Sequence, residues 1–173
     1  MSKGMFSRFF TIILAAVLTA SCAVNPVTGR RQLSLISEQG EIEMGKETDA
    51  QIKQEYGFYE DKELTAYVTK IGMAMAPLTH RPKLEYHFAV LDTPVVNAFA
   101  APGGYIYVTR GILAMMNSES ELATVIGHEL GHVNARHSVV KLSEMMLAQV
   151  GLIAGSILSE DFAKYAGAAS LGM

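Results

Sequence analysis

The chain has 173 residues, of which half are hydrophobic and 18% are charged, as in an ordinary globular domain. Its formal net charge is −3, and no basic patch or stripe follows the sequence. Proteins that bind nucleic acid neutralise phosphates with clustered Lys and Arg side chains, so no nucleic-acid partner is expected.

The N-terminus has the pattern of an export signal. Lys3 and Arg8 precede an uncharged apolar run, Phe9 to Ala20, which small residues follow. The run has about a dozen residues, whereas a membrane span needs roughly 20. Residues 1–22 are therefore interpreted as a signal peptide. A short N-terminal anchor helix is the alternative.

Cys22 is the only cysteine of the chain, and it lies just after the apolar run. The run Thr19-Ala20-Ser21-Cys22 resembles a bacterial lipoprotein box, although Thr19 stands where the box usually has an aliphatic residue. Lipidation of Cys22 would tether the chain to a membrane surface without spanning it. Ordinary cleavage after Ala20 or Ala23 is the alternative. Lipoproteins that stay at the inner membrane usually have an aspartate directly after the lipidated cysteine. This chain has Ala23 at that position, so we expect a periplasmic protein anchored to the outer membrane.

Two helices are expected after the signal. Residues 23–36 contain Asn-Pro and Thr-Gly turn signals and are interpreted as a tether. A helix is expected from Ser37, its cap, to Tyr56, because Gly57 then ends it. A second helix is expected over residues 61–76, where apolar residues recur at helical spacing.

The hydrophobic period then changes to that of β-strands. Residues 84–90 alternate between apolar and polar side chains, which predicts a strand. Residues 95–100 and 105–108 are expected as two more strands, with a Pro-Gly-Gly turn at 102–104 between them. The expected sheet is small and mainly antiparallel.

A helix with a clear start signal follows the sheet. Ser118 and Glu121 form a capping box, so the helix is expected to begin near Glu119 and to meet no stop signal before Arg136. The uninterrupted apolar part of the next segment, residues 145–158, is too short for a membrane span. It is expected as a buried helix.

The capped helix carries the run VIGHELGH, which contains His128-Glu129-x-x-His132. Helix positions i and i+4 lie about 40° apart, so both histidines can direct a ring nitrogen at one metal ion. Glu129 lies about 60° from His132, within reach of a water bound to that metal. This arrangement predicts a metalloprotease site in which zinc acidifies the water and Glu129 is the general base. A helix with two ordinary histidines and an exposed glutamate is the alternative.

A catalytic zinc needs a third protein ligand, and no neighbouring residue is convincing. On a continuous helix His137 lies about 140° from His132, so it is expected to support or pack near the site instead of binding the metal. Glu144 lies far along the helix axis. Glu160 and Asp161 follow the apolar segment, and neither begins a Glu-x-x-x-Asp pattern.

Three runs resemble the M48 family of zinc metallopeptidases, and more narrowly its bacterial periplasmic lipoprotein members. They are NPVTGRRQLSLIS (25–37), VNAFAAPGGYIYVTRGIL (96–113) and SELATVIGHELGHVNARHS (120–138). The resemblance covers nearly all of the chain after the signal. It implies a gluzincin-type α+β domain over residues 37–173, with a long active-site helix packed on the small, mainly antiparallel sheet and further helices.

The resemblance also implies roles for individual residues. His128 and His132 bind one Zn²⁺ per chain, and Glu129 is the catalytic base. The strand that lines the family's cleft, where an extended polypeptide substrate adds as a further strand, corresponds to four residues. They are Asn97, Ala98, Phe99 and Ala100. A plain core hairpin is the alternative reading of this segment.

In the family, the third zinc ligand is a glutamate of a downstream Glu-x-x-x-Asp helix, so it is expected beyond Met173 and the domain is expected to be incomplete there. Two functions remain open. One is a zinc metalloendopeptidase that hydrolyses envelope proteins in quality control, with outer-membrane assembly machinery as a candidate partner. The other is a non-proteolytic peptide-binding chaperone or adaptor lipoprotein, which lacks the third ligand.

Overall fold

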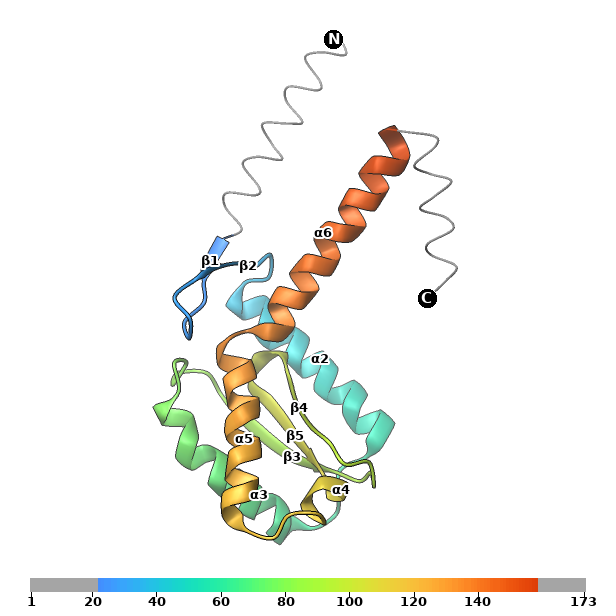
Figure 1. Cartoon of the computed structure of the whole chain (residues 1–173). Coiled ribbons are helices and arrows are strands. Elements are labelled where there is room, and N and C mark those ends of the chain that lie inside the picture. The colour runs from blue at the N-terminus through green and yellow to red at the C-terminus, as the bar shows by residue number, and fades with distance from the viewer. Residues whose placement is uncertain (1–21, 159–173) are drawn as a thin grey trace.

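A computed structural model describes residues 22–158 of the chain. The predicted signal peptide up to residue 21 lies outside the described residues, as do Glu160 and Asp161. The described part is a mixture of helices and short strands, which confirms the α+β class (Figure 1). In chain order the elements are β1 (Cys22–Val24), β2 (Arg31–Leu33), α2 (Glu38–Tyr56), α3 (Lys62–Met75), η1 (Ala76–Leu78), β3 (His87–Leu91), β4 (Ala98–Ala101), η2 (Pro102–Gly104), β5 (Tyr105–Thr109), α4 (Arg110–Leu113), α5 (Glu119–Asn134) and α6 (His137–Leu158).

The main sheet has the strand order β3-β5-β4. Strands β4 and β5 form an antiparallel hairpin, as expected, and the tight turn between them uses positive φ values at Gly103 (75°) and Gly104 (96°). The expectation of a mainly antiparallel sheet is wrong for the other pair, because β3 runs parallel to β5. The chain crosses from β3 to the far side of β5 before it forms the hairpin. Strand β4 is therefore an edge strand of this sheet.

Helices cover both faces of the sheet, so the central strand β5 is buried along its whole length (Figure 1). On one face Ile106 and Val108 pack in a core to which α3 and α5 contribute. On the other face Tyr105 and Tyr107 pack with Ile52 of α2. Burial of these apolar side chains is the main force that fixes α5 against the sheet.

The segment expected as a tether contains structure of its own. Strands β1 and β2 pair as an antiparallel hairpin whose turn includes Asn25, of which only 5% is exposed. The Asn25 side-chain oxygen accepts hydrogen bonds from the backbone N–H groups of Val27 and Thr28, at 2.8 and 3.0 Å. Its Nδ2 donates to the carbonyl oxygen of Ala135 at 3.3 Å. The hairpin is thereby joined to the end of α5.

Helix α6 projects from the body of the domain (Figure 1). The expectation that its apolar segment is buried is wrong for the described side chains, because several of them are exposed. These are Met145, Met146, Val150, Leu152 and Ile153. The apolar composition indicated burial, but it did not indicate which element would cover the helix. Within residues 22–158, no helix has the length and hydropathy that crossing a membrane requires.

Candidate metal centre and active site

Helix α5 carries the histidine motif, and its N-terminal cap and its buried side chains hold it in place. The predicted cap at Ser118 is present, since its hydroxyl accepts from the Glu121 N–H at 3.3 Å. The Glu121 carboxylate accepts from the N–H of Asn117, one residue before the cap, at 2.8 Å, so the second bond of the predicted capping box is shifted by one residue. Four apolar side chains of the helix are buried in the core against the sheet. They are Leu122, Ile126, Leu130 and Val133. This stripe fixes the rotation of α5 and leaves the motif histidines on its more exposed side.

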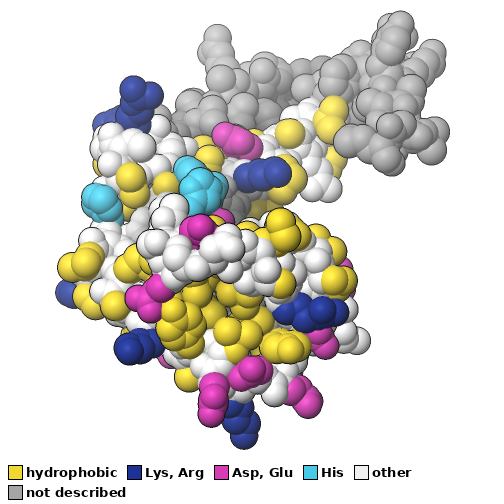
Figure 2. Space-filling view, turned by 60° about the horizontal axis from the view of Figure 1, so that its bottom comes forward, with side chains coloured by type: hydrophobic (Ala, Val, Ile, Leu, Met, Phe, Trp, Pro, Cys, Tyr) yellow, Lys and Arg dark blue, Asp and Glu magenta, His cyan; other side chains and the backbone are white. Residues whose placement is uncertain are grey.

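The two motif histidines converge on one point. The Nε2 atoms of His128 and His132 lie 3.0 Å apart, and the rings are nearly perpendicular, at 76°. Two nitrogens bound to one tetrahedral zinc ion at 2.0–2.1 Å are separated by about 3.3 Å. The observed separation is thus close to that of two nitrogens bound to one zinc ion. Figure 2 shows a group of histidine side chains on the surface, beside a hollow and next to an acidic side chain.

Glu129 is buried between the motif helix and strand β4, with 8% of the residue exposed. Burial raises the pKa of its carboxyl group above the ordinary value, whereas the charges of His132 and His128 and a hydrogen bond from the Ala100 backbone lower this pKa. The net effect is a raised pKa, which brings the group closer to the range suited to proton transfer near neutral pH. This position agrees with the expectation that the Glu129 carboxylate lies beside the two histidines.

The predicted substrate strand lies directly beside this carboxylate. Ala98, Phe99 and Ala100 belong to β4, and Asn97 immediately precedes it. The Phe99 ring packs on Tyr107 with a centroid distance of 5.1 Å, toward the α2 face. Ala98 and Ala100 pack against the core on the α5 face. The two alternatives for this segment are therefore compatible, because one face of the strand builds core while its outer edge lies beside the motif helix.

The described residues bring together the two predicted histidine ligands and the predicted base, but they hold no group of three His, Cys, Asp or Glu side chains that could bind a metal ion. Glu144 lies on α6, which is a separate helix. The predicted downstream candidates, Glu160 and Asp161, fall outside the described range. Residues 22–158 therefore supply no third ligand beside His128 and His132.

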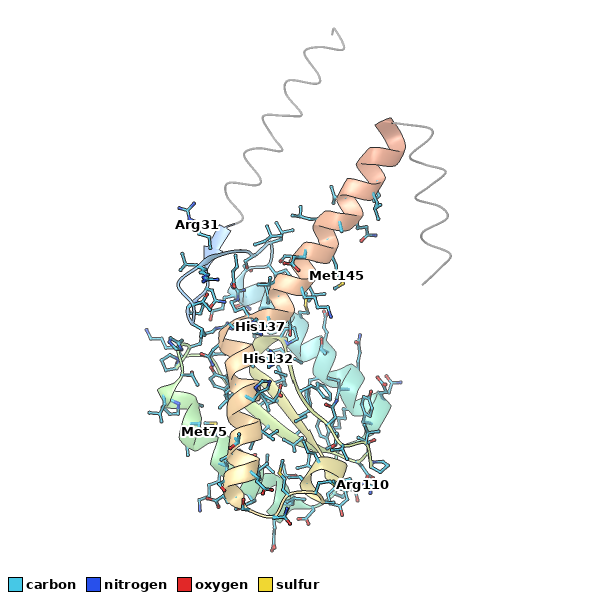
Figure 3. All side chains as sticks on the ribbon, viewed as in Figure 1. Arg31, Met75, Arg110, His132, His137 and Met145 are labelled. Atoms are coloured by element: carbon cyan, nitrogen blue, oxygen red, sulfur yellow. The ribbon has the colours of Figure 1, made fainter. Side chains whose placement is uncertain are left out.

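His137 lies near the predicted ligand pair, as expected, but the helix geometry used for this expectation does not hold. Helix α5 ends at Asn134, and Arg136 adopts a left-handed conformation with φ of 55° before α6 begins. The expected separation of 140° from His132 is wrong, because it assumed one continuous helix. The Nδ1 atoms of His132 and His137 lie 2.7 Å apart, and the two side chains meet at the junction of α5 and α6 (Figure 3).

A buried ionic cluster, which was not predicted, lies behind the junction of α5 and α6. Glu41 of α2 is 1% exposed and receives Arg81 Nη1 at 2.8 Å and Arg136 Nε at 2.8 Å. The backbone N–H of Gly103 also donates to Glu41, at 3.4 Å. Each of these charged residues resembles an ordinary surface residue in the sequence, and only the tertiary structure joins them. The cluster connects α2, the β4–β5 turn and the end of α5.

Comparison with known proteins places the domain in a family. Residues 62–171 match the model of peptidase family M48. The mitochondrial metalloendopeptidase OMA1 of Schizosaccharomyces pombe is 32% identical over 124 residues, which are 68% of this chain and 36% of that protein. The beta-barrel assembly-enhancing protease of Escherichia coli is 29% identical over 162 residues, which are 91% of this chain and 33% of that protein. The chain thus spans about a third of the length of these two relatives. Because the family model matches well over half of its residues, the chain belongs to peptidase family M48.

Proposed function

We propose that this chain carries the zinc-binding and proton-transferring part of a metalloendopeptidase. The observation that carries the proposal is the convergence of the His128 and His132 Nε2 atoms, 3.0 Å apart, next to the buried carboxylate of Glu129. His128 and His132 would hold the zinc ion, and a third ligand would come from outside the described residues. When bound, zinc would polarise the scissile carbonyl group and make the attacking water more acidic.

Glu129 is the residue that moves protons in this proposal. Its carboxylate accepts a proton from the attacking water and then donates it to the leaving amine. The burial of Glu129 supports this role, since a raised pKa favours a group that must both accept and release a proton near neutral pH. The hydrogen bond from the Ala100 backbone orients the carboxylate toward strand β4.

An extended polypeptide would bind along the outer edge of β4. The Thr109 N–H donates to the Asn97 carbonyl oxygen at 3.1 Å, and hydrogen-bonded partners alternate along an antiparallel pair. The backbone groups of Ala98 and Ala100 consequently point away from β5. The Ala100 N–H already donates to Glu129, so an added strand would pair with the backbone of Ala98 and thereby lie next to Glu129.

The setting of the reaction is proposed from the sequence and the relatives. Residues 1–22 would direct export, and a lipid on Cys22 would hold the protein at the outer membrane, facing the periplasm. The substrates would be envelope proteins undergoing quality control, with outer-membrane assembly machinery as a partner. The similarity to a protein named beta-barrel assembly-enhancing protease supports this choice of substrate class.

The test measures zinc content and cleavage of an unstructured polypeptide by the full chain. We expect close to one zinc per chain, and we expect His128→Ala to lose it. Glu129→Gln should keep the zinc and lower the cleavage rate by about 10²- to 10⁴-fold, the usual contribution of a general base. Full activity in Glu129→Gln would contradict the proposal. Polypeptide binding that persists with a chelator, without cleavage, would instead support the chaperone or adaptor function.

A further inference from the structure

We propose that His137 is a positioning residue that holds the metal ligand His132 in the correct tautomer and orientation. This inference rests on the proposed zinc site. The role assigned to His137 is to accept a hydrogen bond from the Nδ1–H of His132, so that the opposite nitrogen, Nε2, presents its lone pair to the metal.

The two ring nitrogens of His132 have different partners. Its Nε2 lies 3.0 Å from Nε2 of His128, and its Nδ1 lies 2.7 Å from Nδ1 of His137. A neutral imidazole carries one proton, and a nitrogen that binds a metal must be free of it. The proton of His132 is then on Nδ1, where it needs an acceptor. Nδ1 of His137 lies at hydrogen-bonding distance and can accept this proton when its own proton is on Nε2.

The same geometry argues against His137 as a metal ligand. A metal held by both motif histidines lies next to their Nε2 atoms. His137 contacts the other nitrogen of the His132 ring. The imidazole ring of His132 therefore separates the metal position from the Nδ1 atom of His137. Supporting partners of this kind fix the orientation of metal-binding histidines and raise metal affinity.

The fold builds this contact by breaking the helix between the two residues. Arg136 has a φ of 55°, which is uncommon for a residue other than glycine. Its guanidinium is held by the Glu41 carboxylate at 2.8 Å and by the Ile36 carbonyl oxygen at 3.0 Å. The break starts α6 at His137, directly against His132. On a continuous helix the two side chains would point in different directions.

The experiment measures the zinc affinity of the full chain by competition with a chromophoric chelator. We expect His137→Ala to weaken zinc binding by about 10- to 100-fold, as is usual when such a partner is removed. His137→Asn places a carbonyl oxygen at the side-chain position that Nδ1 occupies, so it should retain most of the affinity. His80→Ala removes another exposed histidine and should leave the affinity unchanged. Thermal unfolding of the metal-free proteins should be the same, because His137 is exposed.

The outcomes separate this inference from the proposed function. If His128→Ala abolishes zinc binding and His137→Ala binds zinc like the wild type, the positioning role is overturned and the zinc site stands. If His137→Asn loses as much affinity as His137→Ala, acceptance of the hydrogen bond is not the role of His137. If the wild-type chain binds no zinc, the proposed function and this inference both fail.

Discussion

Glu41 and Arg136 form a buried ion pair with a distance of 2.8 Å, although they are 95 positions apart in the chain. Arg81 binds the same carboxylate, so one negative charge holds two guanidinium groups. The arrangement ties α2 to the break between α5 and α6. The position of His137 beside His132, the proposed metal ligand, thus depends on a residue near the start of the domain.

Removal of this carboxylate should destabilise the whole domain. Glu41→Ala leaves Arg81 and Arg136 without their buried partner, which should lower the free energy of unfolding by about 3–5 kcal/mol. Glu38 is the matched control, because it lies in the same helix and also pairs with Arg81, at 3.2 Å, but its side chain is 65% exposed. Glu38→Ala should cost less than about 1 kcal/mol. Urea denaturation measures both values, and equal losses in the two variants would contradict the importance assigned to Glu41.

The buried hydroxyl group of Tyr107 should make the free energy of unfolding depend on pH. Its hydroxyl donates to the Asp49 carboxylate at 2.7 Å, and burial and this hydrogen bond raise its pKa well above the ordinary value of 10.0. Above pH 10 the unfolded chain loses this proton while the folded chain keeps it, so stability falls with rising pH by up to about 1.4 kcal/mol per pH unit. At pH 7 Tyr107→Phe should cost about 1.5–3 kcal/mol, since the bond has a charged acceptor. The difference between wild type and variant should shrink above pH 10, and a constant difference would contradict this explanation.

Two helix glycines should respond in opposite directions to the same substitution. A Cβ atom at Gly72 of α3 would lie 2.3 Å from ring carbons of Phe88, so Gly72→Ala should cost about 1–3 kcal/mol. A Cβ atom at Gly131 of α5 would have no atom within 4 Å apart from its chain neighbours and the nearby backbone of its own helix. Gly131→Ala should therefore stabilise the domain by about 0.5–1 kcal/mol through helix propensity. Chemical denaturation measures both, and a neutral Gly72→Ala would show that α3 is packed less closely on β3.

Local signals predicted the elements well, because each signal acts over a few residues. The caps at Ser37 and Ser118 and the stop at Gly57 place helix ends close to the observed ones. The order of the strands was not predictable in this way, since the same hydrophobic pattern suits a parallel or an antiparallel neighbour. The break at Arg136 also has no local signal, as neither Gly nor Pro is present there. A tertiary contact with Glu41 stabilises it.

The candidate site likewise contains features that local sequence predicts and features that depend on tertiary contacts. The placement of His128 and His132 on one side of a helix, next to Glu129, was predictable, because a helix fixes their relative directions whatever surrounds it. His137 was expected near the site, but its direct contact with Nδ1 of His132 was not predictable, because this contact depends on the break between two helices. The contact between Glu129 and the edge of β4 likewise depends on how the helix packs against the sheet.

The last prediction concerns the outer edge of β4. Replacement of Ala98 by proline removes one N–H group that points away from β5, so it spares the hydrogen bonds between the two strands. An extended peptide that pairs with this edge should then lose one hydrogen bond, worth about 0.5–1.5 kcal/mol, and bind roughly 2- to 12-fold more weakly. Ala98→Gly keeps the N–H and is the control. Fluorescence anisotropy with a labelled unstructured peptide, in a Glu129→Gln background that prevents cleavage, measures the affinity. Equal affinity in the proline and glycine variants, with both folded and zinc-loaded, would mean that substrate backbone does not pair with β4 at this position.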